Sequence, residues 1–266
     1  MKKILVIGDG CQDIFQYGTC ERMCPEAPVP IFKPTSSTKN GGMSLNVLKN
    51  LRGLSVDADI VRNKELPTKT RFIDVESNQM LMRYDINDRV DYISLETLNK
   101  INYSLYDGVI ISDYNKGFLA EDDISFIASR CKSEEVPIFL DTKKKINYPM
   151  IKNIDFIKIN EKEFIENKSG FIGYDGHIIY TMGRKGAFHM NLINGRNQHF
   201  PIDDEHPVRD LSGAGDTFLA AFVVEYLDSH EIPSAINFAN ACASWVVTQK
   251  GVVSITIEKA RELYCV

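Results

Sequence analysis

Short apolar runs recur along the chain, and turn residues or helical patterns separate them. Five runs show no alternation of apolar and polar positions: residues 4–7, 109–111, 137–140, 156–159 and 178–180. Helical patterns lie between or after several of these runs, at residues 44–54, 121–131, 216–227 and 234–247. Unbroken apolar strands separated by helices are typical of a parallel sheet that is buried on both faces. The pattern therefore predicts a single α/β domain over residues 1–266, with three α/β/α layers around a central, mostly parallel sheet.

Two segments depart from this alternation. Residues 14–34 are rich in Tyr, Pro and Cys and contain the sequence PEAPVP at 25–30, and residues 68–85 alternate in strand fashion without a helix. Proline suits edge strands or bends better than a central strand. The two segments are expected to pair into a small separate sheet.

Composition narrows the choice of partners. Hydrophobic residues make up 44% and charged residues 25% of the 266 residues, which is typical of a soluble globular protein. The net charge of −5 provides no basic field for nucleic acid, so a phosphorylated substrate must be held by local positive groups. No apolar run approaches the length of a membrane span. The six cysteines include no C-x-x-C pair and no zinc-finger spacing, which favours reduced thiols in a cytoplasmic protein.

The segment most informative about chemistry is Asp-Leu-Ser-Gly-Ala-Gly-Asp-Thr-Phe at residues 210–218. Gly213, Ala214 and Gly215 precede an acid, and a helical pattern follows. A helix N-terminus presents unpaired N–H groups and partial positive charge, and small residues let a phosphate approach them. Asp216 is then expected in the first turn, as a weak base that accepts a hydroxyl proton. This arrangement suits a kinase, and an ordinary helix cap is the alternative.

Polar or glycine-rich segments also follow five of the predicted strands, where ligands of doubly wound sheets bind. One such segment means little, but five on one edge of one sheet predict a site. They are Gly8-Asp9-Gly10 with Asp13, and residues 112–117, 141–143, 160–163 and 181–186.

The first of these segments is not a dinucleotide fingerprint. Asp13 stands where the fingerprint needs a glycine, and a carboxylate there would repel a pyrophosphate, so NAD is not expected. A P-loop sequence is also missing. Asp9 and Asp13 suit hydrogen bonds to sugar hydroxyls, or they only close a turn. At the start of the next helix, Gly42 would let a ligand come close, and the Asn46 amide could bond a ligand hydroxyl. The alternative is that both residues belong to an ordinary helix start.

Taken together, these segments resemble the ribokinase-like (PfkB) family of carbohydrate kinases. Residues 210–217 resemble one family signature, and the double glycine followed by Asn46 resembles the other. The resemblance is closer to the kinase domain of the bacterial heptose enzymes, which phosphorylate the anomeric hydroxyl of D-glycero-D-manno-heptose 7-phosphate. It covers nearly the whole chain and is carried by Tyr17-Gly18, PEAPVP at 25–30, Thr68-Lys69-x-Arg71, NQxLxRxD at 78–85, SDYxKG at 112–117 and FANA at 238–241.

The resemblance implies an ATP- and Mg²⁺-dependent sugar kinase with a ribokinase-like fold, whose small β lid comprises about residues 14–34 and 68–85. The implied catalytic base is Asp216, and the implied anion hole is formed by Ser212, Gly213, Ala214 and Gly215. The implied nucleotide-binding residues are Asn160, Glu163, Thr181, Gly183, Gly186 and Ser212. Of these, Asn160 and Glu163 are also implied to bind Mg²⁺ indirectly. Asp210 is a candidate for a monovalent cation such as K⁺. The family also often forms a homodimer through the lid.

The implied sugar contacts are Asp9, Asp13, Gly42 and Asn46. Lys69, Arg71 and Arg83 are candidates to bind the substrate's distal phosphate because they are positively charged. The alternative is that they lie on a solvated face of the lid.

The chain departs from the family pattern in two places. About one turn, at residues 61–67, replaces a further helix and strand, and the stretch 163–177 is shortened. A lost edge unit removes buried area and exposes a sheet edge, so a looser nucleotide pocket is expected. The adenylyltransferase domain fused to this kinase in some bacteria is not expected, since the sequence ends shortly after Val253.

Three functions therefore stay open: a heptose 7-phosphate kinase, a kinase of the same fold for another sugar, sugar phosphate or nucleoside, and a non-catalytic sugar- or nucleotide-binding relative. Retention of Asp216, Asn160 and Glu163 argues against the third.

Overall fold

The computed structural model describes residues 2–202 and 207–264 of the chain. Its main sheet has eight strands in the order β12-β11-β10-β9-β8-β7-β1-β4. Their bounds are β1 (Lys3–Gly8), β4 (Asp57–Arg62), β7 (Gly108–Asp113), β8 (Ile138–Thr142), β9 (Phe156–Asn160), β10 (His177–Thr181), β11 (Ala187–Asn191) and β12 (Asn197–Phe200). The strands from β4 to β10 pair in parallel, and β11 and β12 add an antiparallel end. The predicted central, mostly parallel sheet is confirmed.

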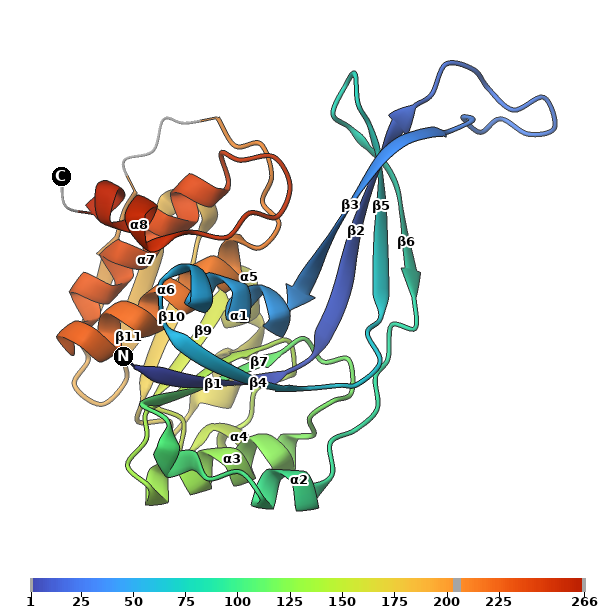
Figure 1. Cartoon of the computed structure of the whole chain (residues 1–266). Helices are drawn as coiled ribbons and strands as arrows, with labels where there is room; N and C mark the ends of the chain where they lie inside the picture. Colours follow the sequence, from blue (N-terminus) through green and yellow to red (C-terminus); the bar gives the residue numbers. More distant parts are fainter. Residues whose placement is uncertain (1, 203–206, 265–266) are drawn as a thin grey trace.

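Helices cover both faces of this sheet (Figure 1). One face packs against α1 (Ser44–Gly53), α6 (Ala214–Ser229), α7 (Ile232–Val246) and α8 (Ile257–Tyr264). The other side carries α2 (Leu95–Asn99), α3 (Glu121–Ser133), α4 (Tyr148–Ile151) and α5 (Glu161–Asn167). Successive side chains of a strand point to opposite faces, so Ile4 and Val6 of β1 enter one core while Leu5 and Ile7 enter the other. This double burial explains why the strands are mostly apolar and lack strict alternation.

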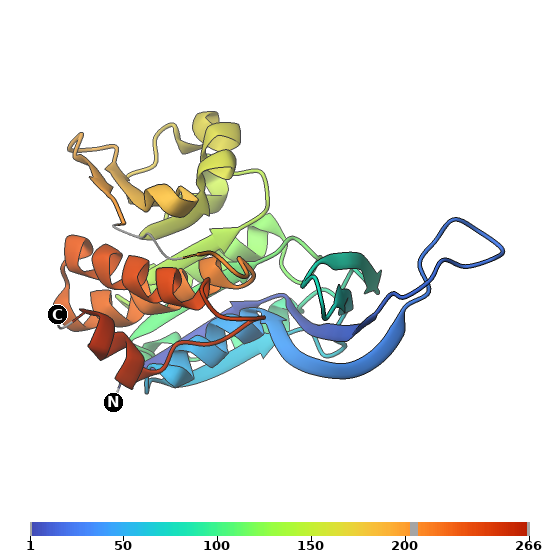
Figure 2. The same ribbon diagram turned by 90° about the horizontal axis from the view of Figure 1, so that it is seen from above.

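A second sheet projects from the body beyond the carboxyl end of β1 (Figures 1 and 2). We call it the lid sheet; it contains β2 (Gly10–Thr19), β3 (Lys33–Met43), β5 (Thr68–Asp74) and β6 (Met80–Ile86), in the order β3-β2-β5-β6. It extends beyond the two segments that the sequence marked, because β2 begins at Gly10 and β3 runs to Met43. Residues 25–30, with three prolines, lie in the connection between β2 and β3 instead of in a strand.

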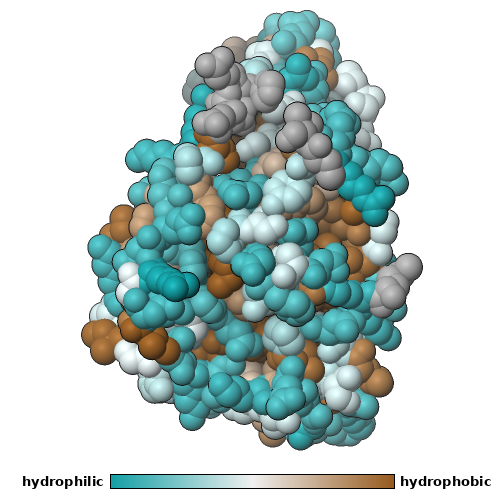
Figure 3. Space-filling view, turned by 90° about the vertical axis from the view of Figure 1, so that its left-hand side faces the viewer, coloured by the Kyte–Doolittle hydropathy of each residue, from teal (hydrophilic) through white to brown (hydrophobic). Residues whose placement is uncertain are grey.

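The shortened segment after β4 leaves that strand at the edge of the main sheet, since only residues 63–67 separate β4 from β5. The edge carries Asp57, Asp59 and Arg62, and such charges discourage pairing with another chain. On the face turned away from the lid sheet, hydrophobic residues form small patches between hydrophilic ones (Figure 3). Among the described residues, none of the helices combines the length and the apolar character needed to span a bilayer.

Candidate active site

The N-terminus of α6 forms the centre of the site. Gly213 precedes the helix with φ 83°, in the left-handed region that glycine adopts without strain. A Cβ at Gly213 would lie 2.6 Å from Asn46 Nδ2, and one at Gly215 would lie 2.9 Å from Lys158 Nζ. The absence of a side chain at these two glycines thus lets Asn46 of α1 and Lys158 of β9 come close to the start of α6. Asp216 stands in the first turn of α6, as the sequence predicted.

The Asp216 carboxylate is 5% exposed and accepts two hydrogen bonds. The Tyr114 hydroxyl donates to Oδ1 at 2.6 Å, and the Asn46 amide donates to Oδ2 at 2.9 Å. Burial raises the pKa of Asp216 to about 6, although these two hydrogen bonds and Lys158 oppose the shift. Asp216 is therefore a stronger base than the sequence led us to expect, because burial outweighs the two hydrogen bonds and Lys158.

Asp216 lines a cavity of about 380 Å³ between the lid sheet and the carboxyl edge of the main sheet. The cavity contains nine of the residues that the sequence singled out: Asp13, Gly42, Asn46, Lys69, Arg71, Arg83, Ser212, Gly213 and Asp216. It also contains six that the sequence did not assign: Cys11, Met43, Tyr114, Lys116, Lys143 and Val252. A Cβ at Gly42 would lie 2.0 Å from Asp13 Oδ2, so the absence of a side chain there leaves the Asp13 carboxylate its place.

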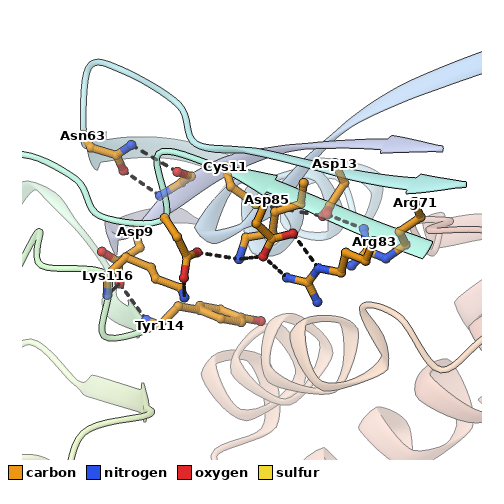
Figure 4. Close-up of polar contacts among 12 residues, drawn as sticks. Asp9, Cys11, Asp13, Asn63, Arg71, Arg83, Asp85, Tyr114 and Lys116 are labelled. Carbon is orange, nitrogen blue, oxygen red and sulfur yellow. Dashed lines mark hydrogen bonds and ion pairs between the residues drawn. The ribbon is translucent and has the colours of Figure 1, made fainter. Parts of the chain in front are cut away.

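Each cation on the lid side of the cavity has a carboxylate partner (Figure 4). The ion pairs are Arg71 with Asp13, Arg83 with Asp85 at 2.7 Å, Lys69 with Asp88 at 3.2 Å and with Asp85 at 3.8 Å, and Lys116 with Asp88 at 2.6 Å. A phosphate that enters this side would have to compete with these carboxylates. It would find Lys69, Arg83 and Lys116 in one network, and Arg71 in a separate pair with Asp13.

Asp9 has a different place from the one expected of a sugar contact. Its side chain is fully buried, and its carboxylate accepts the backbone N–H groups of Tyr114, Lys116 and Phe118 at 2.7, 3.3 and 3.2 Å. It does not line the cavity. Because it is fully buried and bonded to these amides, Asp9 anchors the loop after β7 and does not face the cavity.

Lys158 is a site residue that the sequence reasoning missed. It lies in the middle of β9, is 5% exposed, and its ammonium group lies 2.7 Å from Asp141 Oδ2. Burial raises the pKa of Asp141, but Lys158 and Lys143 outweigh it and hold that pKa below the ordinary value. A lysine inside the apolar run Phe-Ile-Lys-Ile is the signal that could have revealed this residue, because a buried cation needs a partner or a ligand.

Asn160 and Glu163 form a capping box at the start of α5. The Glu163 N–H donates to Asn160 Oδ1 and the Asn160 N–H donates to Glu163 Oε2, both at 2.9 Å. Glu163 Oε1 also lies 2.7 Å from the ammonium group of Lys143, a residue of the cavity. Among the described residues, no three His, Cys, Asp or Glu side chains are grouped to hold a metal ion. The Asn160 and Glu163 oxygens are of the type that Mg²⁺ prefers, and in this structure the capping box and Lys143 occupy them.

Thr181, Gly183 and Gly186 lie at the end of β10 and in the turn that follows it, outside the cavity at Asp216. Gly186 has φ 85°, and a Cβ there would lie 2.1 Å from the Phe200 carbonyl oxygen. The Gly186 backbone therefore lies close to Phe200, just before Pro201 and Ile202. Pro201 and Ile202 line a larger cavity of about 700 Å³, together with Trp245 and Arg209.

A third cavity of about 220 Å³ lies between the two others. Arg209 lines the large and the third cavity, whereas Ser212 lines the third cavity and the one at Asp216. Asp210 lines the third cavity as well, and its Oδ1 accepts the Ser212 N–H at 2.8 Å. The segment 209–213 therefore runs along a row of three cavities that ends at the cradle of α6.

Residues 41–260 match the family model described as pfkB family carbohydrate kinase. Curated relatives named bifunctional protein HldE, from Marinomonas sp. and Helicobacter pylori strain J99, are 29% and 30% identical, each over 97% of this chain. The alignments cover 63% and 65% of those proteins, so the chain spans just under two thirds of their length.

Solved structures with the same fold include Arabidopsis thaliana ribokinase complexed with ribose and ATP, and Escherichia coli phosphofructokinase-2 in complex with potassium. Their TM-scores are 0.75 and 0.77 at 16% and 12% identity. The matches cover 99% of this chain and 98% of the first structure, and 100% of this chain and 99% of the second. The ribokinase-like fold that the sequence predicted is confirmed.

Proposed function

Because the chain belongs to the pfkB family of carbohydrate kinases, which transfer a phosphoryl group to a sugar hydroxyl, we propose that its acceptor is the anomeric hydroxyl of D-glycero-D-manno-heptose 7-phosphate. The donor is ATP, with Mg²⁺. The observation that carries the kinase mechanism is the position of Asp216: together with Gly213 it lines a cavity at the N-terminus of α6. The heptose is inferred from the sequence resemblance, and the HldE relatives support it by their similarity alone.

When bound, ATP·Mg²⁺ supplies the phosphoryl group and the metal charge that screens the phosphates. Asp216 accepts the proton of the acceptor hydroxyl, and the N–H groups of residues 213–215 bind the oxygens of the phosphoryl group. Lys158 Nζ lies directly behind Gly215 and adds a positive charge to this cradle. Because phosphoryl transfer has a loose transition state, positioning and charge neutralisation dominate, and the proton can leave the hydroxyl late.

The lid side of the cavity is assigned to the acceptor. Asp13 and Asn46 are proposed to bind sugar hydroxyls, since both line the cavity. Lys69, Arg71 and Arg83 are proposed to bind the distal phosphate by exchanging their aspartate partners for it. Closure of the lid sheet would then exclude water from the phosphoryl group.

The nucleotide is assigned to the row of cavities along segment 209–213, with the base in the large cavity beside Trp245 and the phosphates toward Gly213. Asn160 and Glu163 would bind hydrated Mg²⁺, the loop at Thr181, Gly183 and Gly186 would support the nucleotide, and Asp210 would bind a monovalent cation.

We further propose a homodimer through the lid sheet, because all seven residues of β6 are exposed and include Met80, Met82 and Tyr84. The proposed compartment is the cytoplasm, where ATP is available.

The direct test is ADP release from ATP·Mg²⁺ by the purified protein with a panel of acceptors: the heptose 7-phosphate, fructose 6-phosphate, ribose and nucleosides. Turnover with the heptose 7-phosphate in marked preference to the others is the expected result. Preference for another acceptor would reject the heptose while keeping the kinase. No acceptor-dependent ADP release at all would favour the non-catalytic relative.

A further inference from the structure

Tyr114 reaches Asp216 from the loop after β7, and the proposed mechanism leaves it without a role. Its hydroxyl lies 2.6 Å from Asp216 Oδ1, which is a short and charge-assisted contact. Burial, followed by the charges of Asp216 and Asp141, raises the pKa of the Tyr114 hydroxyl well above its ordinary value. The hydroxyl therefore keeps its proton, and Tyr114 is the donor in this bond.

The backbone of the loop is fixed to the main sheet. Asp9, directly after β1, accepts the N–H group of Tyr114 and those of Lys116 and Phe118. Asn115 and Gly117 have φ of 56° and 112°, and these two left-handed residues let the loop turn its amides toward one carboxylate. Asp9 thus holds the backbone from which the Tyr114 ring extends to α6 (Figure 4).

Groups on several surrounding elements change the balance between the charged and the neutral form of the Asp216 carboxyl group. Lys158 of β9 and the N-terminus of α6 favour the carboxylate, as does the amide of Asn46 on α1. Asp141 of β8 disfavours it, and Cys11 of β2, whose pKa burial raises to about 12, stays a neutral thiol. Among these groups, Tyr114 and Asn46 donate directly to the carboxylate, and Tyr114 makes the shorter bond.

We propose that Tyr114 is a positioning residue for Asp216: its hydroxyl keeps the carboxylate charged and oriented toward the cavity, and Asp9 holds Tyr114 in place. The catalytic consequence rests on the proposed kinase function, in which a charged Asp216 receives the acceptor's proton. Because Asp9 accepts the backbone N–H of Tyr114, and the Tyr114 hydroxyl donates to Asp216, Asp9 supports the active site structurally. The sequence position of Asp9 indicated a sugar contact instead.

The test is Tyr114→Phe, which removes one oxygen atom and keeps the ring. Two quantities are measured against pH: the carboxyl ¹³C shift of Asp216 in the free protein, assigned by its loss in Asp216→Asn, and kcat/KM. A hydrogen bond to a charged group typically contributes enough to move the Asp216 titration and the acid limb of kcat/KM upward by about one to two pH units. At high pH, where Asp216 is charged in both proteins, kcat/KM should agree within a few-fold.

Tyr92→Phe is the matched control, because the Tyr92 hydroxyl donates to Asp123 at 2.7 Å outside the site. It should leave both pH curves unchanged. Unmoved curves in Tyr114→Phe, with an active wild-type protein, would overturn the inference. A shifted carboxyl titration in a protein that phosphorylates no acceptor would support the contact between Tyr114 and Asp216 and reject the kinase proposal instead.

Discussion

On the main-sheet side of the cavity, the ion pair between Lys158 and Asp141 leaves only 6% and 5% of the two side chains exposed. On the lid side, the pair between Arg83 and Asp85 leaves 41% and 29% exposed. Breaking a buried pair is costly because an uncompensated charge stays behind, whereas an exposed pair contributes little and exchanges partners readily. Under the proposed function, the buried pair would supply a fixed charge pattern near the phosphoryl group, whereas the Arg83–Asp85 pair is the one on the lid side that a ligand recruits most readily.

The largest effect is expected on the main-sheet side, at Asp216 itself. Asp216→Asn removes the base and should lower kcat by at least roughly a hundredfold with every acceptor, while ATP binding and the fold persist. Steady-state kinetics and nucleotide titration measure the two quantities. Unchanged turnover would remove Asp216 from its role.

Lys158→Met tests the buried charge behind the cradle. If the ammonium group stabilises the migrating phosphoryl group, its loss should lower kcat by a factor of about 10² to 10³, the effect of one oxyanion-type donor, with little change in the KM of the sugar. Circular dichroism checks that the variant keeps the fold. Asp141 retains one cation partner, because its Oδ1 lies 3.3 Å from Lys143 Nζ. A raised KM for the sugar at a normal kcat would indicate that Lys158 binds the acceptor. It would contradict the proposed difference between the main-sheet side and the lid side of the cavity.

Arg83→Met makes the corresponding change on the lid side. Loss of one charge-assisted contact should raise the KM for a phosphorylated acceptor by about ten- to a hundredfold and change kcat only a few-fold. The same sugar without its phosphate is the control, and its KM should stay the same in both proteins. An equal loss for both acceptors would indicate that Arg83 shapes the lid without binding the phosphate.

The smallest effect concerns stability. The pKa of Asp216 is raised to about 6 in the folded protein, so the charged carboxylate destabilises the fold at neutral pH, and this penalty disappears as the pH falls below about 4. Asp216→Asn should therefore raise the free energy of unfolding by about 1–2 kcal/mol at pH 7–8, less than the pKa shift alone implies, because the amide cannot accept hydrogen bonds from both Tyr114 and Asn46. Urea unfolding at pH 8 and pH 4 measures the difference; a variant that is less stable at pH 8 would contradict it.

The same comparison explains what the sequence could predict. Strands buried on both faces leave unbroken apolar runs, and a glycine-rich anion cradle leaves a local motif, so the main sheet and the place of Asp216 in α6 were readable. In contrast, β3 begins with exposed polar residues that carry no periodic signal, so the sequence indicates no strand beyond residue 34.

Contacts between distant segments explain the remaining differences. The sequence position of Asp9 indicates a sugar contact, and it does not reveal that the carboxylate binds three amides 105 to 109 residues away. The sequence places Tyr114 in a polar segment at the sheet edge and in a family motif. It does not reveal the bond to Asp216, because that bond joins residues 102 positions apart. Lys158 alone had a visible signal, a cation inside a buried strand.

The central claim is that the cavity at Asp216 holds the acceptor hydroxyl, and a crystal structure of Asp216→Asn with D-glycero-D-manno-heptose 7-phosphate and ATP·Mg²⁺ tests it most directly. We expect the anomeric hydroxyl within hydrogen-bonding distance of residue 216, and the 7-phosphate among Lys69, Arg71 and Arg83. A sugar bound away from residue 216, or a phosphate that avoids the lid cations, would contradict it.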